Sequence, residues 1–152
     1  MLMKKILSIF ILFALLFSLL SCREQRDAYA ILSEFVNAYG AEGVIYSPSI
    51  PEGERGYMPD GMTEKIYVFC GNLPDNFAVF LNSRADFGAE CGVFVCSDAA
   101  QCDIAEEACL ERIGILGRGS ENAFVKRTDR VVFYSTLTDK KRAEELWREI
   151  IR

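Results

Sequence analysis

The chain has 152 residues, with 17 basic and 22 acidic side chains and no histidine, which gives a formal net charge of −5 at pH 7. Because an acidic protein is repelled by nucleic acid and by anionic headgroups, this balance argues against nucleic-acid binding. The lack of histidine excludes Ser-His-Asp and Cys-His nucleophile systems, zinc sites with histidine ligands and the usual general base at neutral pH.

The first 21 residues have the layout of a signal peptide. Lys4 and Lys5 precede a largely apolar run of 15 residues, 6–20, and polar residues follow from Ser21. As a helix this run is about 22 Å long, at roughly 1.5 Å per residue, which is short of a hydrocarbon core of about 30 Å. We therefore expect residues 1–21 to direct export and to be removed. The product has 131 residues and a net charge of −7, because the two leader lysines are lost.

The end of this leader, Leu19-Leu20-Ser21-Cys22, resembles the bacterial lipobox. In that motif a leucine lies three residues before the cysteine and a small residue directly precedes it; Leu20 departs from the small or β-branched residue usual at its position. The resemblance implies cleavage after Ser21 and lipidation (palmitate) of Cys22, which anchors the protein on the extracytoplasmic face of the cell membrane. An ordinary secretory signal and an uncleaved anchor are the alternatives.

Residues 22–61 are expected to form a helix and a loop. The helix is predicted over 24–40 and ends at Gly40, because apolar residues recur at spacings of three and four. They are Ala28, Leu32, Phe35, Val36 and Tyr39. Segment 47–61 holds three of the four prolines and is expected to be the longest loop. Tyr57 and Met58 at its tip are candidate contact residues, although a mobile insertion fits its length better.

Residues 62–152 have the pattern of an α+β domain. Met62 to Cys70 is predicted as a short helix, with a strand as the alternative. Two β-rich runs follow, 77–81 and 89–96, which we expect to pair as antiparallel neighbours. Asp98 and Gln101 then resemble a capping box that starts a helix. The apolar stripe of this helix, closed by Gly117, consists of Cys102, Ala105, Cys109, Ile113 and Leu116.

A second hairpin and a last helix complete the domain. Runs 123–127 and 130–136 flank a turn at Thr128-Asp129, and Thr138 is expected to cap a helix that buries Trp147. Its other apolar residues are Ala143, Leu146 and Ile150. The order ββαββα predicts a four-stranded antiparallel sheet with the helices on one face, preceded by the N-terminal helix.

From Met62 to Ile151 this outline resembles a family of small lipoproteins of clostridia and their relatives that carry a domain of unknown function. The shared features are the lipobox leader, a short region ending near Gly71, two strands, a long helix, a strand flanked by basic residues and a closing helix. The resemblance implies no catalytic residue and no cofactor. The clustered cysteines of this chain are not part of the family outline.

Five cysteines follow Cys22, so at least one has no intramolecular disulfide partner. They are Cys70, Cys91, Cys96, Cys102 and Cys109. Cys91 and Cys96 point to opposite faces of a strand, and Cys102 and Cys109 lie about 10 Å apart along a helix. Bridges from strand to helix, Cys96 to Cys102 or Cys91 to Cys109, remain open. Buried free thiols are the preferred interpretation, and the lack of C-x₂-C gives zinc or redox motifs weak support.

Acidic residues form a ridge on the middle helix at Asp103, Glu107 and Glu111, beside Glu106. A solvated helix face explains this ridge better than a divalent-cation site or a surface for a basic partner, since a metal needs oxygens from several directions. The glycines of 114–120 end a helix, whereas a phosphate loop would start one. We therefore predict no metal site.

These features predict a membrane-anchored extracytoplasmic lipoprotein whose domain is a binding or accessory module. Its contact surface would be the 47–61 loop or an uncovered face of the sheet. The expected partners are the lipid bilayer, through acylated Cys22, and an envelope protein or ligand. A thiol- or carboxylate-based envelope enzyme or redox protein and a structural envelope component are the alternatives.

Overall fold

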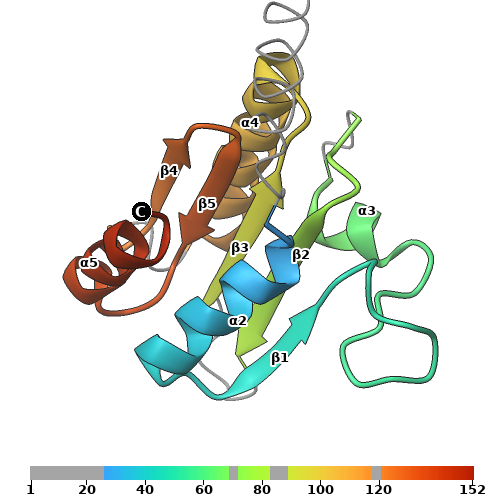
Figure 1. Ribbon diagram of the computed structural model, residues 1–152, viewed down its shortest axis with the longest axis horizontal. Coiled ribbons are helices and arrows are strands. Elements are labelled where there is room, and N and C mark those ends of the chain that lie inside the picture. The colour runs from blue at the N-terminus through green and yellow to red at the C-terminus, as the bar shows by residue number, and fades with distance from the viewer. Residues whose placement is uncertain (1–25, 69–71, 83–88, 118–120) are drawn as a thin grey trace, which may run out of the picture.

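The computed structural model describes residues 26–68, 72–82, 89–117 and 121–152, which form an α+β domain around an antiparallel sheet (Figure 1). The elements are α2 (Ala28–Tyr39), β1 (Gly43–Tyr46), α3 (Met62–Ile66), β2 (Phe77–Asn82), β3 (Glu90–Val95), α4 (Ala99–Leu116), β4 (Phe124–Thr128), β5 (Val131–Ser135) and α5 (Lys140–Ile150). Within the described ranges, no helix has the length and apolar character needed to cross a bilayer.

Within the described residues the sheet has five strands in the order β1-β2-β3-β5-β4, so the prediction of four strands was wrong. The additional strand is β1, which pairs antiparallel with β2 through Val44 and Leu81 at its centre. Four residues are too few to show a clear alternating pattern, and only pairing with β2 makes this segment a strand. α2 and β1 therefore share the core of the residues that follow them, even though the sequence pattern places them in a separate segment.

The helices cover both faces of the sheet, which corrects the prediction of one covered face. In Figure 1, α2 and α5 lie in front of the sheet and α4 lies behind it. The burial of the central strands agrees with this arrangement. Residues 77–80 of β2 and all residues of β3 are buried, although successive side chains point to opposite faces of the sheet. A strand that is buried on both faces reads as a continuous apolar run, and residues 77–81 are such a run.

The front face is packed by large apolar side chains. Trp147 is 2% exposed and stacks on Phe133 of β5 with ring centroids 4.2 Å apart, and Phe35 packs edge-on against the same ring. Gly40 ends α2 in the left-handed conformation, as predicted. The cap of α5 differs from the prediction: Asp139, rather than Thr138, accepts the hydrogen bond from the Arg142 amide, so the helix begins one residue later.

The back face is packed by small side chains of α4. Its buried residues are Cys102, Ala105, Ala108 and Cys109, whereas Ile113 and Leu116 at the end of the predicted stripe are only partly buried. The Asp98 cap is confirmed: its carboxylate accepts from the Gln101 amide at 2.9 Å. The Gln101 side chain in turn accepts from the Ser97 amide at 2.8 Å. In a standard capping box it would accept from the amide of the cap residue itself, Asp98.

Two connections differ in detail from the prediction. The β4–β5 turn is Asp129-Arg130, because Thr128 already pairs with Val131; Asp129 adopts the positive φ of 51° that this turn needs and that aspartate tolerates. In the 47–61 loop, Met58 is buried and Tyr57 bridges to Ser47, so neither residue lies at the tip. The exposed tip consists of residues 51–55.

Candidate functional site

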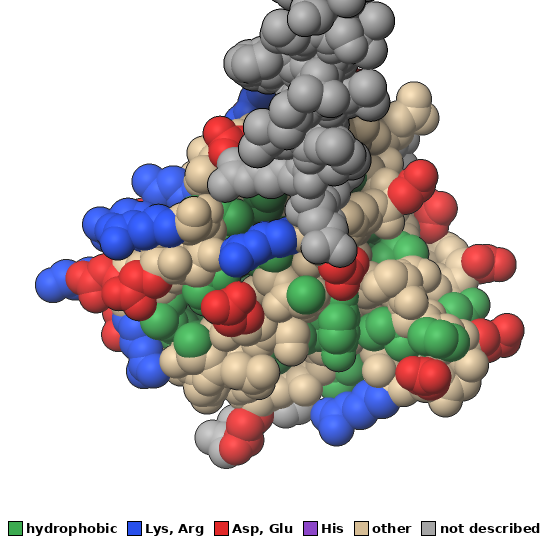
Figure 2. All heavy atoms as spheres, in the orientation of Figure 1, with side chains coloured by type: hydrophobic (Ala, Val, Ile, Leu, Met, Phe, Trp, Pro, Cys, Tyr) green, Lys and Arg blue, Asp and Glu red, His purple; other side chains and the backbone are tan. Residues whose placement is uncertain are grey.

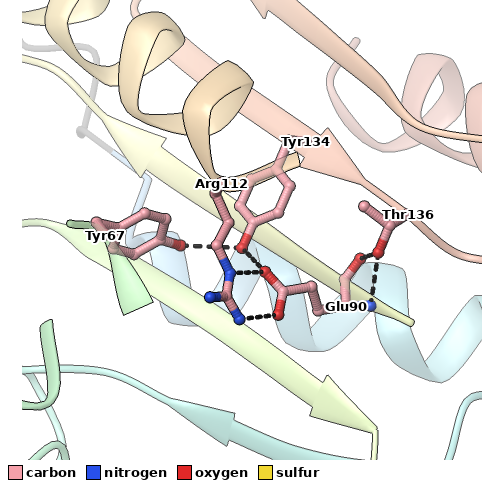
Figure 3. A network of polar contacts seen from close by, with 5 residues as sticks. All are labelled: Tyr67, Glu90, Arg112, Tyr134 and Thr136. Carbon is pink, nitrogen blue, oxygen red and sulfur yellow. Dashed lines mark hydrogen bonds and ion pairs between the residues drawn. The ribbon is translucent and has the colours of Figure 1, made fainter. Parts of the chain in front are cut away.

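A cluster of polar side chains is buried between α4 and the sheet (Figure 3). We call Tyr67, Glu90, Arg112, Tyr134 and Thr136 the Glu90 cluster. Glu90 is the first residue of β3, Arg112 lies on α4, Tyr134 on β5, and Tyr67 directly follows α3. The Glu90 side chain is 4% exposed and the Arg112 side chain 15%. The cluster therefore joins four segments that are far apart in the sequence.

The Glu90 carboxylate is bound from two directions. Arg112 donates from Nε to one oxygen at 2.8 Å and from Nη2 to the other at 2.7 Å, a bidentate geometry. The Tyr134 hydroxyl donates to the first oxygen at 2.7 Å, and the Tyr67 hydroxyl lies 3.1 Å from that of Tyr134. A buried charge needs a partner and hydrogen bonds, and both are provided here.

The backbone of Glu90 is held as firmly as its side chain. Its amide donates to the Thr136 hydroxyl at 2.9 Å, and its carbonyl accepts from the Thr136 amide at 2.9 Å. These bonds extend the β3–β5 ladder one pair beyond Cys91 and Ser135. The carboxylate is thus fixed relative to both strands before Arg112 reaches it from α4.

Gly92 makes room for the two tyrosines. It pairs with Tyr134 across β3 and β5, and a Cβ atom on Gly92 would lie 2.5 Å from the Tyr134 ring and 3.1 Å from the Tyr67 hydroxyl. A glycine inside a strand usually marks a close approach by another group, and here that group is the aromatic pair.

Burial determines the protonation of this cluster. It raises the pKa of Tyr67 and Tyr134 well above the ordinary value for tyrosine, so both keep their protons at neutral pH. The hydrogen bonds to Glu90 raise the pKa of Arg112, which stays charged. With three hydrogen bonds to its carboxylate, Glu90 is engaged in holding α4 on the sheet, and the geometry is that of an anchoring ion pair.

The four described cysteines are buried thiols that lie on both faces of the sheet. Cys91 belongs to the front core, whereas Cys96, Cys102 and Cys109 belong to the back core. The sheet thus separates Cys91 from Cys109, which excludes the bridge considered between them. Burial raises the pKa of Cys91 and Cys109 well above the ordinary thiol value and that of Cys96 to about 12. Cys22 and Cys70 lie outside the described residues.

The acidic ridge of α4 is exposed and partly neutralised. Arg127 of β4 contacts Asp103 at 2.7 Å and Glu106 at 3.5 Å, while Glu107 and Glu111 face solvent. Over the part of the chain that the structure describes, no three cysteine, aspartate or glutamate side chains are grouped as metal ligands would be. The ridge acts as a solvated face that also holds the edge strand β4.

The sequence pattern did not single out the Glu90 cluster. A signal was present, because Glu90 and Gly92 interrupt an otherwise apolar strand on the same face. A buried carboxylate in such a position needs a cationic partner or hydrogen-bond donors. Which groups provide them depends on how α4 lies on the sheet, and the sequence spacing from Glu90 to Arg112 does not show this.

Comparison with protein-family models, with curated proteins and with solved structures finds no match for this chain. The function therefore has to be inferred from the leader, the geometry and the charges of the chain itself.

Proposed function

We propose that the protein is an extracytoplasmic lipoprotein, cleaved after Ser21 and acylated at Cys22, whose domain is a binding or accessory module held at the membrane. The observation that carries this proposal is the leader, which has lysines before a 15-residue apolar run and a lipobox-like Leu-Leu-Ser-Cys after it. Two acyl chains suffice for stable anchoring, since each buried CH₂ contributes about 0.8 kcal/mol.

The start of the folded domain is consistent with cleavage at this point. α2 begins at Ala28, and its cap Asp27 accepts a hydrogen bond from the Ala30 amide, so a chain that starts at Cys22 retains the whole helix and its cap. Arg26 donates to the carbonyl of Ile150 at 2.8 Å, which fixes the entry of the chain beside the end of α5. Five residue steps separate Cys22 from Asp27. At roughly 3.3–3.6 Å per residue they span no more than about 18 Å, so the domain is held close to the bilayer.

The 47–61 loop is the best candidate for the contact surface, because both faces of the sheet are covered. Its base is fixed: the Ser47 amide donates to Gly56 at 3.1 Å, and the Ser47 hydroxyl donates to the carbonyl of Phe77 at 2.9 Å. Met58 is buried on the other side of the loop. A loop that is held at its base and exposed at its tip is suited to recognition.

The charge around this loop indicates the chemistry of its partner. Acidic side chains gather on the side of the molecule that carries β1 and the loop, whereas basic side chains are more numerous over α5 (Figure 2). In this region four exposed acidic residues outnumber two exposed basic ones, Arg55 and Lys65; the acidic residues are Glu52, Glu54, Asp60 and Glu64. We therefore propose a partner with a basic surface, attracted by charge and sensitive to salt.

The anchor is tested by Cys22→Ser in cells supplied with labelled palmitate. We expect the variant to lose the label and to leave the membrane fraction, whereas Cys70→Ser, a matched change at another cysteine, keeps both. Label retained in Cys22→Ser would refute the lipoprotein assignment.

The loop is tested by a photo-crosslinking residue in the intact cell. Placed at Glu52, it should give a discrete adduct that weakens at high salt; placed at exposed Glu145 on α5, it should give none. Equal adducts from both positions would remove the loop as the contact surface.

A thiol-based enzyme or redox catalyst has less support. Catalytic turnover at a thiol needs an accessible sulfur whose pKa is lowered, whereas burial raises the pKa of Cys91, Cys96 and Cys109.

A further inference from the structure

Two of the buried thiols lie together where β3 leads into α4. Cys96 directly follows β3 and Cys102 lies in the first turns of α4, and their side chains are hydrogen-bonded to each other. Both residues are completely buried. Five residues, 97–101, connect them. The contact is therefore local in sequence, yet it joins the sheet to the helix that covers its back face.

The backbone on both sides of this thiol pair is fixed by hydrogen bonds. The Cys96 amide donates to the carbonyl of Arg130 at 2.8 Å, and the Cys102 amide donates to the carbonyl of Asp98 at 3.2 Å. The Cys102 sulfur also lies 4.0 Å from the carbonyl oxygen of Asp129. The capped start of α4 and the β4–β5 turn thus hold the two sulfurs on the same side of the sheet.

We propose that Cys96 and Cys102 are an oxidisable dithiol that forms an intramolecular disulfide when the folded protein meets a small soluble disulfide. The proposal goes beyond the lipid anchor and the loop, and it does not depend on either. It selects one of the two strand-to-helix bridges that the cysteine spacing leaves open and assigns a modification to the junction of β3 and α4.

The reaction is two successive thiol–disulfide exchanges. The Cys102 thiolate attacks one sulfur of the soluble disulfide, which forms a mixed disulfide and releases the first small thiolate. Cys96 then loses its proton and attacks the Cys102 sulfur, which releases the second small thiolate. Two protein thiols are oxidised, and one soluble disulfide is reduced to two thiols. We assign the first step to Cys102 because its sulfur lies beside the β4–β5 turn, 4.0 Å from the carbonyl oxygen of Asp129.

The other described thiols are less suited to this reaction. Cys91 lies in the front core, on the other side of the sheet from Cys102. Cys109 is seven residues after Cys102 on α4, about 10 Å along the helix at 1.5 Å per residue, which is beyond disulfide reach. Cys91 therefore serves as a matched control, since it is an equally buried thiol of β3.

Access to the pair requires local opening. Because both thiols are buried, the reagent reaches Cys102 only when the first turn of α4 or the β4–β5 turn opens. We expect the reaction to be slower than for an exposed dithiol and to accelerate by about tenfold per pH unit while the thiols are mainly protonated.

The experiment uses the full chain in a non-ionic detergent, incubated with glutathione disulfide, alkylated and digested with a protease that cuts before aspartate. Fragment 86–97 contains Cys91 and Cys96, fragment 98–102 contains only Cys102, and fragment 103–128 contains only Cys109. We expect 98–102 to be linked to 86–97 and to be released by reductant. The link should persist in Cys91→Ala and disappear in Cys96→Ala.

Three results would overturn the proposal. They are a fully alkylated 98–102 fragment, a stable glutathione adduct on Cys102 without a cross-link, and a cross-link from 98–102 to 103–128. The urea-denatured chain, treated in the same way, shows that the reagent is active. Near-ultraviolet circular dichroism shows that each alanine variant is folded, so that loss of the link in Cys96→Ala reports on the thiol itself.

Discussion

The two faces of the sheet are held by different kinds of interaction. The front face, under α2 and α5, is apolar and includes the stacked pair Phe133 and Trp147. The back face, under α4, also contains large rings, including the stacked pair Phe77 and Phe94, and adds the buried ion pair of Glu90 and Arg112. Apolar packing therefore stabilises both faces, but only the back face also depends on a buried charged pair whose two partners must both be present.

This difference has a consequence for substitutions. Apolar packing loses stability in proportion to the volume removed, whereas a buried ion pair loses more when one partner is removed than when both are. The two faces should therefore respond to single and double substitutions in different ways.

The largest effect is expected on the front face. Trp147→Ala removes a buried aromatic ring that stacks on Phe133, and it should lower the free energy of unfolding by about 3–5 kcal/mol. Urea unfolding followed by circular dichroism measures this change, with exposed Lys141→Ala as the control. An unchanged unfolding midpoint in Trp147→Ala would contradict the packing described for this face.

On the back face, Arg112→Met leaves the Glu90 carboxylate buried without its cation. We expect a loss of about 3 kcal/mol in the free energy of unfolding. Adding Glu90→Gln should restore part of this loss, because no buried charge then remains. Arg127→Met, which breaks an exposed ion pair, should cost much less. A double variant that is no more stable than Arg112→Met would show that the charge is not the cause.

Two glycines provide a sharper comparison. Gly92→Ala places a Cβ 2.5 Å from the Tyr134 ring and should destabilise the protein by about 1–3 kcal/mol. Gly114→Ala on α4 meets nothing within 4 Å and should stabilise it by about 0.5–1 kcal/mol through helix propensity. Thermal unfolding should therefore shift in opposite directions. A shift in the same direction for both would contradict the close approach at Gly92.

The smallest effect is a pH dependence specific to the back face. Because burial raises the pKa of Tyr67 and Tyr134 in the folded protein, the unfolded chain releases their protons at a lower pH than the folded protein does. Their contribution to stability is therefore complete below pH of about 10 and is lost as the pH rises further. Tyr67→Phe should make the alkaline fall in stability shallower, and exposed Tyr29→Phe should leave it unchanged. Equal slopes for Tyr67→Phe and the unchanged protein would contradict the role of burial.

The front face was largely predictable from sequence and the back face was not. The spacing of Ala28, Leu32, Phe35 and Val36 identified the buried side of α2, and Trp147 was expected in the core. On α4, the stripe through Cys102 and Cys109 was found, but Arg112 lies beside it and was assigned no role. Periodicity detects apolar residues that face a core, whereas a polar residue that is buried by a partner has the same pattern as an exposed one.

The sequence by itself determined the layout of the leader, the antiparallel α+β class and the caps at Asp98 and Gly40, because these depend on residues that are close along the chain. Only the tertiary structure decided that β1 joins the sheet, that helices cover both faces and that Glu90 meets Arg112. These features depend on segments that are distant in sequence, and burial by such segments turns an unremarkable glutamate, arginine or cysteine into a residue with a defined partner.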